Sequence, residues 1–178
     1  MTFPALSELR VYQVDACDCI SYVNREWLSF AQSNNGDALR EEDVLGSELW
    51  SYIAGRQLRQ IYREIFHHVR THQRSIILRS RCDTPDKLRL SSLKIAPLPD
   101  SALSLECQTL EEVPRAALRI LDPRVERTDE LIVMCSVCKG IQSGLGKWEE
   151  LEAALSAMGL LERERFPSLS HGLCPSCA

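Results

Sequence analysis

Residues 15–27 read D-A-C-D-C-I-S-Y-V-N-R-E-W, and this stretch places a tight turn, a short strand and a helix start in succession. Before it, Leu9 to Val14 has the pattern of a strand, and Ile20 to Val23 is its predicted hairpin partner. Asp18 tolerates the left-handed backbone that such a turn favours. Asn24 is a typical N-cap for the helix predicted over Arg25 to Gln32. The chain therefore opens with an antiparallel hairpin followed directly by a helix.

The next segment predicts a long helix and then three strands. Arg56 to His72 repeats apolar residues at intervals of three and four, which is typical of a helix with one buried face. Three partly alternating runs follow it, separated by turn residues: Ser75 to Cys82, Leu88 to Ala96 and Ala102 to Leu110. This order predicts an α+β fold, in which a five-stranded antiparallel sheet carries helices on one face. The aromatic side chains expected between helices and sheet are those of Trp27, Trp50, Tyr62 and Phe66.

This order of elements resembles a PAS domain, a small sensory fold, over about residues 6–112. The turn region at 15–27 resembles the start of that family, V-L-G-S-E-L-W at 44–50 resembles its next landmark, and residues 81–98 resemble its central hairpin. Asp18 departs from the family pattern, where glycine is usual, but it suits the same backbone. The resemblance implies a sensory domain that holds a small ligand or a partner between its sheet and helices.

The sequence predicts three segments along the chain. Residues 1–113 form the PAS-like domain, and 131–178 form a cysteine-rich module. Between them, residues 114–130 are predicted to contain a connecting helix from Arg115 to Leu121 and a charged linker. Pro114 suits the first turn of that helix, and Asp122-Pro123 suits its end. The two flanking segments are therefore expected to fold independently.

Two C-x-x-C pairs predict a structural metal site in the last segment. Cys135 and Cys138 form the first pair, and Cys174 and Cys177 form the second. Zinc prefers four ligands in a tetrahedron, and two such turns supply four thiolates. A helix predicted over Lys147 to Met158 occupies the interval between the pairs. The sequence therefore predicts a zinc-binding module.

The tail also resembles a short cysteine-rich segment found after sensory domains in bacterial signalling proteins. The resemblance is carried by C-S-x-C-K, a helix with a tryptophan, and S-H-G-x-C-P-x-C. In this chain the matching residues are Cys135, Ser136, Cys138, Lys139, Trp148, Ser170, His171, Gly172, Cys174, Pro175 and Cys177. The resemblance implies a module of the same kind and no particular activity.

Three alternatives to a four-cysteine zinc site remain open at this stage. His171 could replace one cysteine as a ligand, because imidazole also binds zinc well. The pairs could instead form a thiol–disulfide switch, or could hold an iron–sulfur cluster. The simplest role for His171 is a hydrogen bond beside the metal centre. The C-x-x-C-H motif of covalent haem attachment is absent.

The remaining cysteines and histidines favour structural roles. Cys17 and Cys19 fall in a predicted turn, where they could be redox-active, but buried or half-buried free thiols are expected. Cys82 and Cys107 fall in predicted strands, where they are expected to fill small apolar spaces. His68 and His72 share one face of the long helix, but their polar neighbours favour a solvated surface.

Composition and motifs indicate a cytoplasmic regulatory protein. The 178 residues carry eight cysteines and a net charge of −4, which argues against nucleic acid as the main partner. Neither an export signal nor a membrane-spanning run is visible, and neither is a catalytic motif. We expect a non-catalytic sensor of bacterial signal transduction that binds a signalling partner, forms a homodimer and contains zinc. The alternative class is a redox-responsive protein or a thiol oxidoreductase that uses the C-x-x-C pairs. No residue pattern names a ligand of the PAS-like domain, and no chromophore signature is present.

Overall fold

The computed structural model describes residues 8–34, 39–53 and 55–178, and its described residues divide into two compact units. Those of the first unit fall within Met1–Ala54, Arg59–Arg79 and Ser91–Leu110. The second unit consists of Gly55–Leu58, Ser80–Leu90 and Glu111–Ala178. Short pieces of the five-stranded sheet thus belong to the second unit, although residues 1–113 are predicted to form one domain.

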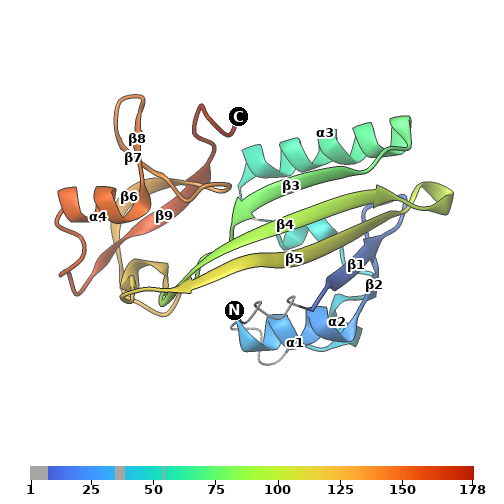
Figure 1. Ribbon diagram of the computed structural model, residues 1–178, viewed down its shortest axis with the longest axis horizontal. Coiled ribbons are helices and arrows are strands. Elements are labelled where there is room, and N and C mark those ends of the chain that lie inside the picture. The colour runs from blue at the N-terminus through green and yellow to red at the C-terminus, as the bar shows by residue number, and fades with distance from the viewer. Residues whose placement is uncertain (1–7, 35–38, 54) are drawn as a thin grey trace, which may run out of the picture. The chain divides into compact units, whose positions relative to one another are not determined.

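The first unit is built on the predicted five-stranded antiparallel sheet, whose strand order is β2-β1-β5-β4-β3 (Figure 1). Its strands are β1 (Arg10–Val14), β2 (Ile20–Val23), β3 (Ile76–Arg81), β4 (Lys87–Pro97) and β5 (Leu103–Pro114). The first hairpin forms as predicted, and Asp18 takes a left-handed backbone with a φ of 63°. β1 then pairs with β5, so the first and last strands of this five-stranded sheet lie side by side.

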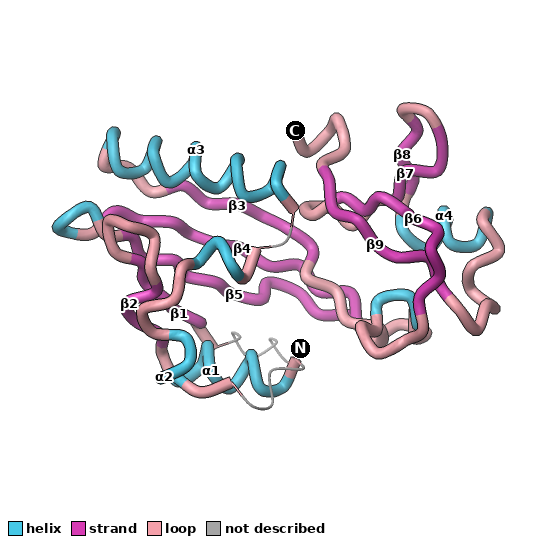
Figure 2. Tube along the Cα trace, turned by 180° about the vertical axis from the view of Figure 1, so that it is seen from behind, coloured by secondary structure: helices cyan, strands magenta, loops and turns pink. Residues whose placement is uncertain are grey.

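Helices cover one face of this sheet. They are α1 (Arg25–Ser33), α2 (Glu41–Val44), the 3-10 turn η1 (Leu49–Ser51) and α3 (Arg56–His72). Figures 1 and 2 show α3 running along β3. The apolar face of α3 contributes Phe66 and Val69 to a core that includes Leu103 and Leu105 of β5. The four aromatic residues predicted between helices and sheet, Trp27, Trp50, Tyr62 and Phe66, all belong to this core or pack against it.

The second unit contains a four-stranded mixed sheet of order β8-β7-β6-β9 (Figure 2). Its strands are β6 (Arg127–Cys135), β7 (Ile141–Gly144), β8 (Lys147–Glu149) and β9 (Phe166–Gly172). β6 and β9 are parallel, and the other pairs are antiparallel. Helix α4 (Leu151–Ala157) packs Leu151 and Leu155 into a second core with Ile132 and Phe166. This sheet was not predicted from the sequence.

Two predicted helices are wrong in whole or in part. The connecting helix from Arg115 to Leu121 is reduced to the 3-10 turn η3 (Arg119–Leu121). The backbone N–H groups of Arg115 and Leu118 donate instead to the carbonyl oxygens of Asp86 and Pro85, at 2.9 and 2.8 Å. These bonds replace the i−4 bonds that a helix needs.

The second error concerns the helix predicted from Lys147 to Met158. Lys147–Glu149 forms β8, because these residues pair with β7, and the helix begins only at Leu151. Residues 127–130 were predicted as linker, yet they form the first part of β6.

Candidate metal centre

The parallel pairing of β6 and β9 brings the two C-x-x-C turns together. Cys135 is the last residue of β6, and Gly172, its partner in the ladder, is the last residue of β9. Because the carboxyl ends of parallel strands meet at the same edge of a sheet, the turns that follow both strands lie side by side. Ser136 donates its backbone N–H to the carbonyl oxygen of Gly172 at 2.9 Å, which extends the pairing into the first turn.

The four predicted cysteines converge on one point. The Sγ atoms of Cys135, Cys138, Cys174 and Cys177 all lie within 4.8 Å of one another, and no disulfide joins them. Four thiolates about 2.3 Å from a tetrahedral zinc ion are separated by about 3.8 Å. The Sγ atoms of Cys138 and Cys174 are 3.7 Å apart, which matches that spacing and is far beyond a disulfide bond. The group could therefore hold a metal ion.

The first C-x-x-C turn has a fixed backbone. Cys135 donates its N–H to the oxygen of Gly140 at 2.7 Å, and Lys139, with a φ of 65°, donates to the oxygen of Cys135 at 3.0 Å. The N–H of Gly140 points at the Sγ of Cys138, 3.4 Å away. A Cβ on Gly140 would lie 3.1 Å from the carbonyl oxygen of Glu149, so glycine allows this close approach to β8.

Burial and neighbouring groups shift the pKa of three of the four thiols. Burial alone would raise the pKa of Cys135, but backbone N–H groups of Cys138, Cys174 and Val137 lower it to about 7. Burial raises the pKa of Cys138 and Cys177, and the neighbouring sulfurs add to this effect. Several thiolates can coexist here only if a positive ion offsets their charge.

His171 does not belong to the converging sulfur group. It lies on β9 opposite Met134 and lines a pocket of about 450 Å³ in the second unit, together with Lys139, Arg127 and Asp83. Burial lowers the pKa of the His171 imidazole, and the charge of Lys139 lowers it further. His171 therefore lines a pocket beside the cysteine turns.

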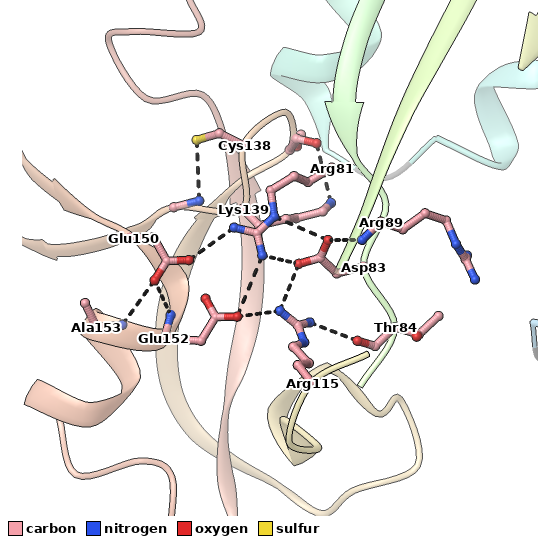
Figure 3. Close-up of polar contacts among 12 residues, drawn as sticks. Arg81, Asp83, Thr84, Arg89, Arg115, Cys138, Lys139, Glu150, Glu152 and Ala153 are labelled. Atoms are coloured by element: carbon pink, nitrogen blue, oxygen red, sulfur yellow. Dashed lines mark hydrogen bonds and ion pairs between the residues drawn. The ribbon is translucent and has the colours of Figure 1, made fainter. Parts of the chain in front are cut away.

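A buried polar network in the second unit was missed by the sequence analysis (Figure 3). The carboxylate of Asp83, whose side chain is 1% exposed, forms ion pairs with Arg81 and Arg115. Arg81 also pairs with Glu150 at 3.1 Å, and Arg115 with Glu152 at 2.7 Å. No local pattern could predict these pairs, because their members come from three distant segments.

This network adjoins the first cysteine turn. The backbone N–H of Arg81 donates to the carbonyl oxygen of Val137, between Cys135 and Cys138, at 2.7 Å. Arg81 is thus bound to the cysteine turn through its backbone and to α4 through the Glu150 cap. Asp83 also accepts from the backbone N–H of Arg89 at 3.2 Å. The same few residues therefore connect Ser80–Leu90 to the cysteine turn and to α4.

The other candidate residues do not belong to the converging sulfur group. In the β1–β2 turn Cys19 is half-buried, as predicted, whereas Cys17 is exposed and the prediction of a buried or half-buried thiol is wrong for it. Cys82 is exposed, so its predicted role as core filling is wrong, and the strand ends one residue before it. His68 and His72 stack their rings 4.3 Å apart on the exposed face of α3.

No model of a known protein family matches this chain, and no curated protein is detectably similar to it in sequence. In the described part of the chain, no helix is long and apolar enough to cross a membrane.

Proposed function

We propose that this chain is a non-catalytic sensory or regulatory protein of bacterial signal transduction. In this proposal the first unit is a PAS-like domain, and the second unit is a zinc-stabilised element that docks a signalling partner. The observation that carries the proposal is the convergence of four cysteine sulfurs from two C-x-x-C turns. Thiolate-only tetrahedral sites leave no open coordination position, so they are structural rather than catalytic.

The first unit supports the sensory part of the proposal. Two strands, a helical insert and three strands follow one another as in the PAS-like pattern, and they form one antiparallel sheet with a single core on its helical side. A domain of this kind would bind a small molecule or a partner and would act as a homodimer.

The second unit supports the zinc part of the proposal. The pairing of β6 with β9 brings its two cysteine turns together, beside a core that includes Ile132 and Phe166. In zinc-finger peptides, metal binding supplies folding free energy on the order of 10 kcal/mol, and a four-thiolate site would stabilise this unit in the same way. A rigid module of this kind suits partner docking, because it presents a fixed surface.

Metal analysis of the purified full-length chain tests the proposal. Protein purified under reducing conditions should contain one zinc ion per chain, and Cys138→Ser should abolish zinc binding and unfold the second unit. Cys82→Ser is the matched control, because Cys82 is an exposed thiol of the same unit outside the sulfur group. Iron with visible absorption would indicate a cluster instead.

A redox function is the second candidate, and the same samples distinguish it. The pKa of Cys135, lowered to about 7, would make its thiolate reactive in the absence of metal. Metal-free protein with a reversible disulfide among these four cysteines would support the redox function and contradict the zinc proposal.

A further inference from the structure

The first unit buries an arginine that has no negative partner in the described part of the chain. Arg10 lies on β1 and is 6% exposed. Its terminal Nη2 donates to Thr109 Oγ1 at 3.1 Å and to Cys107 Sγ at 3.4 Å, both uncharged acceptors. Its guanidinium carbon lies 4.0 Å from the centre of the Phe30 ring. The Nε atom of Arg10 is buried without a hydrogen-bond partner among the described residues.

Arg89 shows what a buried arginine requires when its role is purely structural. Arg10 and Arg89 are the two buried arginines of the described residues. Arg89 forms an ion pair with Glu112 at 2.9 Å, as buried charges generally do. A buried charge without a partner of opposite charge strongly destabilises a fold. The buried guanidinium of Arg10 on β1 therefore needs a reason other than stability.

The surroundings of Arg10 are aromatic and rich in hydrogen-bond donors. Tyr12, two residues along β1, packs its ring 6.2 Å from that of Trp27. Burial raises the pKa of Tyr12 and of Tyr62, so both phenols stay protonated. Guanidinium and phenol groups donate hydrogen bonds to anions, and the rings offer apolar contact.

We infer that Arg10 anchors a ligand site between the sheet and the helices of the first unit, and that its ligand is a small organic carboxylate. A carboxylate supplies the negative charge and the acceptor atoms that Arg10 lacks, and guanidinium matches its planar geometry. An organic acid suits the site better than an inorganic anion, because the Phe30 ring lies against the Arg10 guanidinium and offers apolar contact beside the charge. This inference rests on the proposed sensory role of the unit and names the ligand class.

Stability of the dialysed full-length protein gives the first test. Arg10→Met removes the charge and keeps the aliphatic stem, so the denaturation midpoint should stay unchanged or rise. Arg89→Met, the matched control, breaks a buried ion pair and should lower the midpoint. A loss of stability in Arg10→Met as large as that in Arg89→Met would overturn the inference, because Arg10 would then be a structural residue.

A partner within the chain is the main competing explanation. Asp37 lies outside the described residues. Asp37→Asn should leave the denaturation midpoint unchanged in both the wild-type and the Arg10→Met backgrounds. If Asp37→Asn destabilises the protein only when Arg10 is present, Asp37 is the counter-charge, and the inference fails.

Ligand binding gives the final test, with benzoate as the probe and benzamide as its uncharged analogue. Benzoate should shift the Arg10 Nε–H resonance of the wild-type protein, and Arg10→Met should weaken binding at least about tenfold, because it removes a charge-assisted hydrogen bond. An equal response to benzamide, a response to inorganic phosphate alone, or no response to benzoate would each overturn the inference. Zinc content measured on the same samples separates this outcome from failure of the proposed function.

Discussion

At the scale of single residues, Asp83 carries a buried carboxylate whose charge must be balanced by its neighbours in the second unit. Its carboxylate is almost completely buried and contacts the guanidinium groups of Arg81 and Arg115 together with the backbone N–H of Arg89. Both guanidinium groups depend on this buried anion, because without it Arg81 would lose its nearest carboxylate and Arg115 one of its two carboxylate partners.

Asp83→Asn should therefore lower the free energy of unfolding by about 3–5 kcal/mol, since it removes a buried charge and leaves two guanidinium groups facing a neutral amide. Chemical denaturation of the purified protein measures this change. Glu130→Gln is the control: Glu130 pairs with Arg163 on the surface, so its loss should change stability by less than about 1 kcal/mol. Equal effects of the two substitutions would show that the buried network contributes little.

The Glu150 carboxyl predicts how the second unit responds to acid. Partial burial alone would raise the pKa of Glu150, but contacts with Glu152 and Arg81 and the N–H of Ala153 lower it from 4.5 to about 2. A carboxyl with a lowered pKa stabilises the fold above its unfolded value, and this contribution is lost as the pH falls through the folded value. Stability should thus decline from about pH 4.5 to pH 2.

Glu150→Gln should flatten this decline, as pH-dependent denaturation curves would show. The difference from wild type should be modest, because the Glu150 side chain is 55% exposed and water screens its ion pair with Arg81. An unchanged slope in the variant would assign the acid sensitivity to other carboxyl groups.

At the scale of elements, Asn24 fixes the junction between β1 and α1. Its Oδ1 accepts from the N–H of Trp27, which caps the helix, and from the N–H of Val11 on β1, both at 2.9 Å. Its Nδ2 donates to the carbonyl oxygen of Leu9. Asn24→Ala should destabilise the first unit by about 2 kcal/mol, because it removes a helix cap and leaves a strand N–H unpaired.

Thermal unfolding of the variant measures this effect, with Ser33→Ala as the control. Ser33 lies in the same helix, and its hydroxyl only donates to the oxygen of Ser29 on the exposed surface. Similar melting temperatures for the two variants would mean that Asn24 does not fix the junction.

Local signals explain which elements could be predicted from the sequence. Asn24 as a cap, Asp18 in a turn and the spacing along α3 are properties of neighbouring residues, and these elements are confirmed. β6 and β9 could not be predicted, because their pairing joins segments about forty residues apart and neither run alternates regularly. The helix predicted after Pro114 is wrong for the same reason, because N–H groups of that segment donate to the distant residues Pro85 and Asp86.

The same distinction applies to the metal centre. The C-x-x-C spacing predicts four ligands that could share an ion, and the four sulfurs do converge. Arg81, Asp83 and α4 support that centre through tertiary contacts between distant segments. The spacing of the cysteines could not predict these contacts.

At the scale of the whole molecule, Ser80–Leu90 belongs to the same unit as Glu111–Ala178. This grouping predicts which segments lose structure when a bound metal is removed. The Arg81 N–H donates to Val137, and Ser136 donates to Gly172, so both bonds depend on the shape of the first cysteine turn. Removing the metal with a strong chelator under reducing conditions should speed amide hydrogen exchange in 127–172 and also in 80–90. Amides between β1 and β5, such as those of Tyr12 and Leu105, should keep their protection, because they belong to the first unit.

Hydrogen exchange followed by mass spectrometry distinguishes three outcomes, with Cys138→Ser replacing the chelator in a parallel sample. Faster exchange in 80–90 together with 127–172 supports the observed grouping. Faster exchange in 127–178 alone would mean that 80–90 is held by the first unit, so that the contacts of Arg81 and Asp83 add little stability. Faster exchange in β1 and β5 as well would mean that the chain unfolds as one cooperative body, since loss of one metal ion would then release both cores.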